Sequence, residues 1–145
     1  MTAAKNPAIA EILADWLVAT RAENLPASTV EMCRKLFLDV AGLCVSAREE
    51  DYVRACVGAA ERGQCTAIGH AGGFDAFSAA LINGTAAHGE DYDDTFEGGP
   101  VHSGAVIIPA VLGVCEREGL GDDRFLVGVA TGCELLCRQI GRAHV

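Results

Sequence analysis

Lysine is scarce in this chain of 145 residues, which has only Lys5 and Lys35. Acidic residues outnumber lysine and arginine by 20 to 11, so the formal net charge is −9 at pH 7. Binding to a phosphate backbone depends on clustered cationic side chains, and this balance argues against a nucleic acid partner. Long apolar runs are missing too, since the longest, residues 104–115, is shorter than the roughly 20 residues that cross a bilayer. We therefore expect neither nucleic acid nor a membrane as a partner.

Paired cysteine motifs are also absent. The sequence has seven cysteines but no CxxC pair, which argues against a zinc motif or a dithiol redox motif. Cys33, Cys44, Cys133 and Cys137 fall on apolar stripes of predicted helices. Reduced and buried thiols of this kind are typical of a cytoplasmic protein rather than of a disulfide framework. The N-terminal stretch is interrupted by acids and does not have the apolar core of a signal peptide. We therefore expect a cytoplasmic location.

Half of the residues are apolar, and their spacing predicts an all-α fold of about six helices with no sheet of consequence. Four of the predicted helices cover residues 7–20, 52–60, 74–87 and 105–117. Another starts near residue 26, and the last follows residue 122 or 123. The helix over residues 105–117 is apolar nearly all round, which predicts burial on every side. Residues 65–68 alone have strand character, and residues 70–73 are a predicted turn.

Polar residues before several of these helices are expected caps. Asn6 is the expected cap of the first helix. Ser28 and Glu31 have the spacing of a capping box at the second. Asp122 or Asp123 is the expected cap of the last.

The chemistry-bearing residues concentrate in one irregular segment, residues 88–104, which carries two of the four histidines and five carboxylates. A histidine oriented by a carboxylate can exchange a proton near pH 7, as general acid–base catalysis requires. Two other interpretations stay open: Asp93 and Asp94 cap helices, or two histidines and carboxylates bind a metal, although no HExxH-type spacing supports the latter. An EF-hand is excluded, because Phe96 stands where its loop requires glycine. His70 lies in a separate Gly-rich turn and is expected to be solvated.

Residues 83–95 (NGTAAHGEDYDDT) and 102–110 (HSGAVIIPA) resemble the MmgE/PrpD family, which includes 2-methylcitrate dehydratase and cis-aconitate decarboxylase. Residues 36–42 and 123–134 are similar to helical stretches that flank this block in the family. The resemblance implies that residues 1–145 are the N-terminal part of a larger all-α domain, in a longer protein that also has an α/β domain. The final residues 140–145 can be encoded by DNA similar to a sequencing adapter, so we expect a reading frame that is cut off there. The alternative is that they continue the last helix.

The resemblance also implies a function and a set of site residues. Family members are typically homodimeric lyases and isomerases that act on di- and tricarboxylates without a cofactor, so we expect neither a cofactor nor a resident metal. By motif position, His102 matches the catalytic histidine, and Asp91 and Thr95 match active-site residues. His88 is a further candidate that supports the site or binds substrate. Ser103 follows His102 where many members have proline.

These observations together predict a dehydratase-like or decarboxylase-like lyase that works by proton transfer. His102 is the expected general acid/base, with Asp91 orienting it and Thr95 hydrogen-bonding the substrate. The five carboxylates of the segment would repel a polyanionic substrate, so we expect the positive groups to come from elsewhere and the isolated chain to carry half of an active site. The alternatives are an isomerase or epimerase of the same fold and a helical domain without catalytic activity.

Overall fold

The computed structural model describes residues 7–143, with side chains through residue 138. The elements in chain order are α1 (Ile9–Ala19), the short 3-10 helix η1 (Ala22–Asn24), α2 (Ala27–Ala47), α3 (Asp51–Ala59), β1 (Arg62–Thr66), β2 (Gly73–Phe74), α4 (Ala76–His88), α5 (Ser103–Glu118) and α6 (Asp122–Ala143). Within the described range there are thus six α-helices and one small sheet, which confirms the predicted, mostly helical fold.

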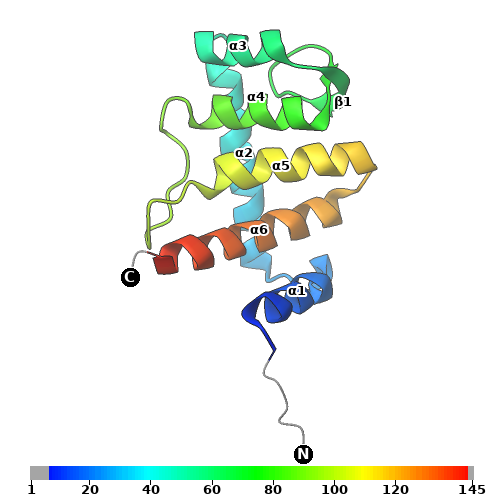
Figure 1. Ribbon diagram of the computed structural model, residues 1–145, viewed down its shortest axis with the longest axis vertical. Helices are drawn as coiled ribbons and strands as arrows, with labels where there is room; N and C mark the ends of the chain where they lie inside the picture. The colour runs from blue at the N-terminus through cyan, green and yellow to red at the C-terminus, as the bar shows by residue number, and fades with distance from the viewer. Residues whose placement is uncertain (1–6, 144–145) are drawn as a thin grey trace, which may run out of the picture.

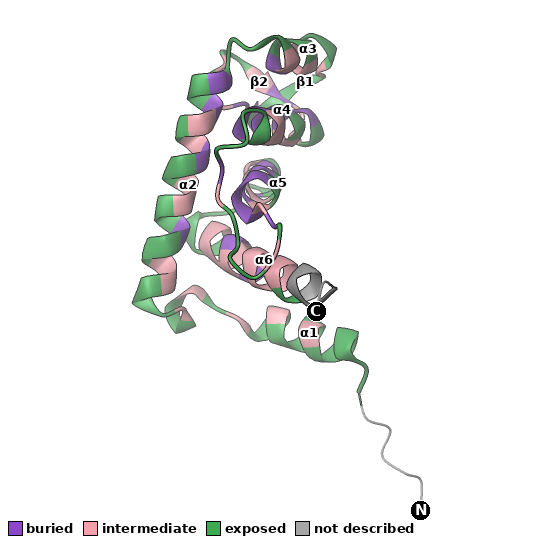
Figure 2. Cartoon of the chain, turned by 90° about the vertical axis from the view of Figure 1, so that its left-hand side faces the viewer, coloured by how far each residue is buried: buried purple, intermediate pink, exposed green. Residues whose placement is uncertain are grey.

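Helix α2 runs along one side of the molecule and contacts α4, α5 and α6, which lie one beside the next across it (Figure 1). Its buried residues include Cys33, Val40 and Cys44, spaced seven and four positions apart. This spacing keeps the apolar side chains on one face of a helix. Figure 2 shows that face turned toward the other helices, with exposed residues along the outer side of α2.

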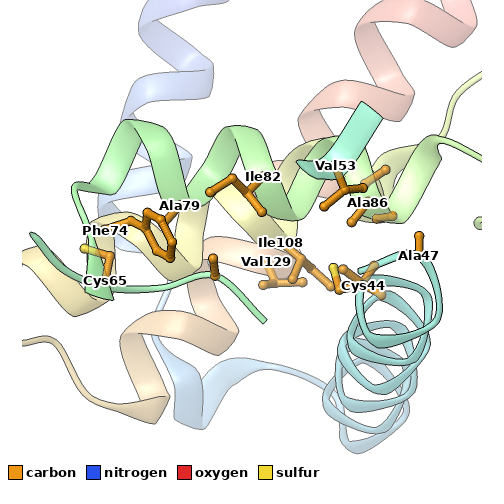
Figure 3. Close-up of a cluster of buried hydrophobic side chains, with 14 of the residues drawn as sticks. Cys44, Ala47, Val53, Cys65, Phe74, Ala79, Ile82, Ala86, Ile108 and Val129 are labelled. Carbon is orange, nitrogen blue, oxygen red and sulfur yellow. The ribbon is translucent and has the colours of Figure 1, made fainter. Parts of the chain in front are cut away.

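The core lies where α2 meets the stacked helices. Val53 of α3, Ile82 of α4, Ile108 of α5 and Val129 of α6 are fully or almost fully buried, and Phe74 of β2 extends the cluster at one end (Figure 3). Burial of each such side chain contributes about 1.5–3 kcal/mol relative to exposure. Since every main element except α1 supplies a core residue, this cluster fixes the order in which the helices stack.

Helices α4 and α5 pack antiparallel at unusually close range. A Cβ at position 113 of α5 would lie 3.0 Å from the carbonyl oxygen of Ala76, at the start of α4. Near the other end of the pair, a Cβ at position 84 of α4 would lie 3.2 Å from the carbonyl oxygen of Ala105. Glycine at both positions therefore lets the two backbones approach each other without intervening side chains. The end of α4 is in this way placed beside the start of α5.

Asn83 ties α4 to the segment after β1. Its side chain is buried, its Nδ2 donates to the carbonyl oxygen of Thr66 (2.8 Å) and its Oδ1 accepts from the amide of Ile68 (2.7 Å). Both polar ends of the buried amide side chain thus have a hydrogen-bond partner, as buried polar groups require. It fixes the small sheet against the middle of α4.

The capping predictions for the second and last helices are wrong. Helix α2 begins at Ala27 with Pro26 in the cap position, and Glu31 pairs with Lys35 (2.8 Å) instead of closing a capping box with Ser28. Helix α6 already includes Asp122 and Asp123 in its first turn, so neither residue is the cap. Their negative charges interact favourably with the helix dipole there. Asn6, the expected cap of the first helix, lies outside the described residues.

The strand and the start of α4 also differ from the prediction. The strand begins at residue 62 rather than 65 and pairs antiparallel with Gly73–Phe74, so the predicted turn ends in a strand. Helix α4 begins at Ala76 instead of residue 74, because the Asp75 side chain accepts hydrogen bonds from the amides of Phe77 and Ser78. This cap is what ends the extended segment.

Burial of α5 on every side is not observed. Val106 and Val114 on its outer face are 57% and 43% exposed, and on the adjoining helix α4 Phe77 is 75% exposed. Helix α1 forms as predicted, yet none of its residues is buried. Its apolar stripe, with Ile12 and Trp16, is therefore only partly covered by the rest of the described chain.

All seven cysteines lie in the described part of the chain, and all are free thiols. Burial raises the pKa of Cys44 and of Cys133 to about 11. Cys33 and Cys44 are buried as predicted, whereas Cys133 and Cys137 are half-buried. Within residues 7–143, none of the helices combines the length and apolar composition needed to cross a membrane.

Replacing Gly113 by valine tests the close contact between α4 and α5. The new Cβ meets a backbone carbonyl at 3.0 Å, so the helices must separate, and overpacking of this kind costs about 1–3 kcal/mol. Urea unfolding followed by circular dichroism measures the loss. Gly42→Val is the matched control, because nothing lies within 4 Å of a Cβ at that exposed position of α2. Equal stabilities of the two variants would contradict the proposed contact.

Candidate active site

The two histidines of the irregular segment are brought together by the α4–α5 pair. His88 is the last residue of α4, and His102 directly precedes the first residue of α5. Their ring centroids are 4.9 Å apart. The segment between them leaves the end of α4, passes toward the C-terminal end of α6 and returns to the start of α5 (Figure 1). Residues 14 positions apart in the sequence thus face each other at one end of the helix stack.

Asp93 contacts both imidazole rings. Its Oδ1 and Oδ2 are 3.0 and 3.1 Å from Nδ1 of His88, and its Oδ1 is 3.3 Å from Nδ1 of His102. The Asp93 side chain is completely buried, whereas the side chains of His88 and His102 are 53% and 27% exposed. The carboxylate thus sits behind both rings, with the rings between it and solvent.

Nδ1 of His102 is buried and, among the described residues, has no hydrogen-bond partner. Its 3.3 Å approach to Asp93 is an ion-pair distance without the angles of a hydrogen bond. The other ring nitrogen, Nε2, lies 3.9 Å from Oδ1 of Asp91, which is 80% exposed. One nitrogen of His102 therefore faces a buried acid and the other faces a solvated one.

The structure brings Asp91 and His102 into one place, as the sequence predicted. Their 3.9 Å separation is longer than a direct hydrogen bond and short enough for one water to join them. Asp91 has a left-handed backbone conformation, with φ of 57°, and its amide donates to the carbonyl oxygen of His88 (3.0 Å). This tight turn directs the chain back toward the histidines. Thr95 is exposed and makes no hydrogen bond to these side chains within the described part of the chain.

Asp94 holds the N-terminus of α5. Its Oδ2 accepts from the hydroxyl of Ser103 and its Oδ1 from the amide of Gly104, both at 2.7 Å. A carboxylate at this end of a helix satisfies free amides and interacts favourably with the helix dipole. Ser103, the departure from the family pattern, thus supplies one of the two donors. A Cβ on residue 104 would overlap Asp94 Oδ1 and lie 2.8 Å from Leu36 Cδ1, so glycine permits this close contact.

The neighbouring acids Asp93 and Asp94 resolve an alternative that the sequence left open. Asp94 has the capping role, whereas Asp93 contacts the histidines. Sequence reasoning did not select Asp93 as a site residue. The signal that could have found it is its distance of five positions from His88, which lets a turn at the helix end bring the two side chains together.

A cavity of about 770 Å³ opens beside the histidines, between α4, α5 and α6. His88 and His102 line it together with mostly apolar neighbours, among them Tyr52, Leu81, Val106 and Leu136. Burial, with a hydrogen bond to Glu90, raises the pKa of Tyr52 to about 12, so this hydroxyl stays protonated near neutral pH. No lysine or arginine is among the described lining residues.

His70 lies away from this cavity, as expected, but it is only partly exposed. The residue is half-buried, and its Nε2 is buried without a hydrogen-bond partner among the described residues. The expectation failed because the turn folds back onto α2. Gly69, with φ of 86°, lies against the Arg48 side chain near the end of that helix.

Comparison of the sequence with known proteins identifies its family. Residues 11–144 match the MmgE/PrpD N-terminal domain. The chain is 26% identical over 133 residues to the cis-aconitate decarboxylase-like protein oryM of Aspergillus oryzae (strain ATCC 42149 / RIB 40), covering 84% of this chain and 28% of that protein. It is 30% identical over 117 residues to the cis-aconitate decarboxylase of Aspergillus terreus (strain NIH 2624 / FGSC A1156), covering 78% of this chain and 24% of that protein.

No solved structure matches the chain. The chain spans about a quarter of the length of the curated relatives it matches. The family match nevertheless extends over almost all of its own residues, including both histidines and the acids between them. The chain therefore belongs to the MmgE/PrpD family.

Proposed function

We propose that this chain carries the proton-transfer part of the active site of a lyase that acts on a di- or tricarboxylate. The observation that carries the proposal is the pair of histidines at the cavity wall, with the buried Asp93 carboxylate behind them. His102 is the proposed general acid/base. A histidine backed by a carboxylate has a fixed ring orientation and a stabilised imidazolium form, which suits it to take up and release one proton.

The two nitrogens of His102 have different proposed tasks. Nδ1 faces the buried Asp93, and Nε2, on the side of the solvated Asp91, exchanges the proton with the substrate. Asp91 assists through a water molecule, given its 3.9 Å distance. His88 supports the site through the contact of its own Nδ1 with Asp93. Thr95, exposed on the same segment, is the proposed hydrogen-bond donor to substrate.

Decarboxylation is the reaction that the relatives' names favour over dehydration, since both are named for cis-aconitate decarboxylase. When the bond between carbon and a carboxylate breaks, CO2 leaves and the electron pair stays on the remaining carbon. That carbon needs one proton, which protonated His102 supplies. A dehydratase would instead use neutral His102 to remove a proton from carbon while hydroxide leaves from the neighbouring carbon.

The charge of the site limits what the chain can do alone. Asp91 and Asp93 lie 3.9 and 3.3 Å from His102, and no lysine or arginine lines the described cavity. A substrate with two or three carboxylates is repelled here unless cations or aligned donors are added. We expect the rest of the protein, or a second subunit of a homodimer, to supply them.

A chimaera tests the proposed role of His102. Residues 1–139 are followed by the C-terminal remainder of the Aspergillus terreus relative, and release of CO2 from cis-aconitate is measured. His102→Ala should lower kcat by about 10²–10⁴-fold, the usual contribution of a general acid/base. His70→Ala, which removes a histidine outside the cavity, should leave kcat nearly unchanged. A near-normal rate for His102→Ala would remove this residue from the mechanism.

The chain by itself is expected to be inactive in the same assay, because it lacks the positive groups that the substrate requires. Turnover by the chimaera with none by the isolated chain is the expected pattern. Full activity of the isolated chain would refute the proposed division of the site. Carrying out the reaction in D2O adds a check on reaction class: exchange of deuterium into substrate without loss of CO2 or water would indicate an isomerase.

Asp93 and Asp94 form a matched pair for a further test in the chimaera. Asp93→Asn removes the charge behind His102 and should lower kcat by at least about tenfold, by analogy with the loss of a carboxylate that orients a catalytic histidine. Asp94→Ala removes the acceptor oxygens at the start of α5 and should mainly lower the unfolding free energy, by about 0.5–2 kcal/mol. Thermal unfolding and steady-state kinetics of both variants separate the two roles. The reverse pattern would show that the assignments are exchanged.

A further inference from the structure

Four side chains at the end of the α4–α5 pair form a group with the donor atoms of a transition-metal site. His88, Asp91, Asp93 and His102 each offer one ligand atom, and these four atoms all lie within 4.8 Å of one another. Imidazole nitrogens combined with carboxylate oxygens suit Zn²⁺, Co²⁺ or Ni²⁺ better than Mg²⁺ or Ca²⁺, which prefer oxygen alone.

The separations of these groups are close to those that a bound ion needs. Zinc bonds of about 2.0–2.2 Å in a tetrahedron place neighbouring ligand atoms about 3.3–3.6 Å apart. Asp93 Oδ1 lies 3.0 Å from Nδ1 of His88 and 3.3 Å from Nδ1 of His102, whereas Asp91 Oδ1 lies 3.9 Å from the other ring nitrogen of His102, Nε2. Because one ion binds only one nitrogen of an imidazole, an ion on Nδ1 of His102 gains Asp91 as a ligand when that exposed side chain rotates toward it.

Two features of the cluster favour the binding of a cation. The first is Nδ1 of His102, a buried nitrogen without a hydrogen-bond partner among the described residues. The second is the charge balance, because Asp91 and Asp93 make their ion pairs with histidine alone. The lysine and arginine ion pairs of the described chain all go to glutamates elsewhere: Lys35–Glu31, Arg48–Glu49, Arg54–Glu49, Arg117–Glu118 and Arg138–Glu134.

We propose that His88, Asp91, Asp93 and His102 bind one divalent transition-metal ion, with Zn²⁺ as the physiological type. The ion takes Nδ1 of His102 together with Asp91 and Asp93, the carboxylates that support His102 in the proposed reaction, so it acts as an inhibitor. Binding of the metal ion does not depend on the proposed lyase function, whereas inhibition of the lyase by the ion rests on that function. The spacing of the four ligands, at positions 88, 91, 93 and 102, matches no short metal motif because a helix end, a loop and the next helix start each contribute.

Titration of the 145-residue chain with Co²⁺ tests the binding site directly. A tetrahedral site gives visible absorption bands, and thiolate ligands add a strong near-ultraviolet band. We expect one equivalent of Co²⁺ to bind with visible bands and without the thiolate band, since the cysteines lie outside the cluster. Displacement by Zn²⁺ should abolish the absorption. Absence of binding, or a spectrum dominated by thiolate, would overturn the proposal.

Substitutions assign the ligands. Asp93→Asn and His102→Ala should each weaken Co²⁺ binding by at least about tenfold, because even residues that only support metal ligands have effects of that size. Glu97→Gln is the matched control for Asp93→Asn, since it removes one charge from an exposed position of the same segment. Circular dichroism confirms that each variant is folded, and His88→Ala provides a second probe if Asp93→Asn is not. An equal loss of Co²⁺ affinity with Glu97→Gln would show that the ion is held by general attraction to negative charge, which would overturn the proposed ligands.

Inhibition is measured separately in the chimaera. Stoichiometric Zn²⁺ should abolish CO2 release, and a chelator should restore it. An increase in rate with Zn²⁺ would overturn the proposed inhibition and indicate a metal-assisted reaction. If the chimaera is inactive under all conditions, the proposed function fails while the Co²⁺ titration of the chain still decides the metal site.

Discussion

Glycine at positions 84 and 113 allows the backbones of α4 and α5 to pack directly against each other, and the site depends on that contact. Because the two helices are antiparallel, the last residue of one and the residue before the other become neighbours. The connecting segment then has to turn back within a short distance, which it does through the turn at Asp91. The position of the cluster is thus a consequence of how closely the two helices pack, from about one turn away from the histidines at Gly84 to about three turns away at Gly113.

The adjacent acids Asp93 and Asp94 have different surroundings, and both contact the segment that begins α5. Asp94 accepts a hydrogen bond from a free amide at the start of α5, and Asp93, one residue earlier, places its carboxylate against Nδ1 of both imidazoles. A buried carboxylate needs partners, and here the partners are groups that can themselves gain or lose a proton. The segment therefore uses one carboxylate to fix the position of His102 and the other to influence its chemistry. Both effects act on the same residue.

Much of the fold was predictable because helical periodicity reports directly on burial. Helix ends were less so: Pro26 occupies a cap position that Ser28 was expected to support, and Asp75 starts α4 two residues later than its apolar pattern suggests. Of the site, His102, Asp91 and His88 were found from their residue types and the family resemblance. Asp93 was not, because the sequence does not show which of two consecutive acids faces a ring and which faces a helix end. Only the turn between the helices decides this.

The left-handed backbone of Asp91 has a consequence for how this position can vary. A non-glycine residue held at φ of 57° carries local strain of order 1 kcal/mol, and glycine would relieve it. Glycine would also delete the carboxylate that lies beside Nε2 of His102. Folding and reactivity therefore make opposite demands on one residue. Selection for stability alone would favour glycine at this position, whereas the proposed role of the Asp91 carboxylate beside His102 requires aspartate.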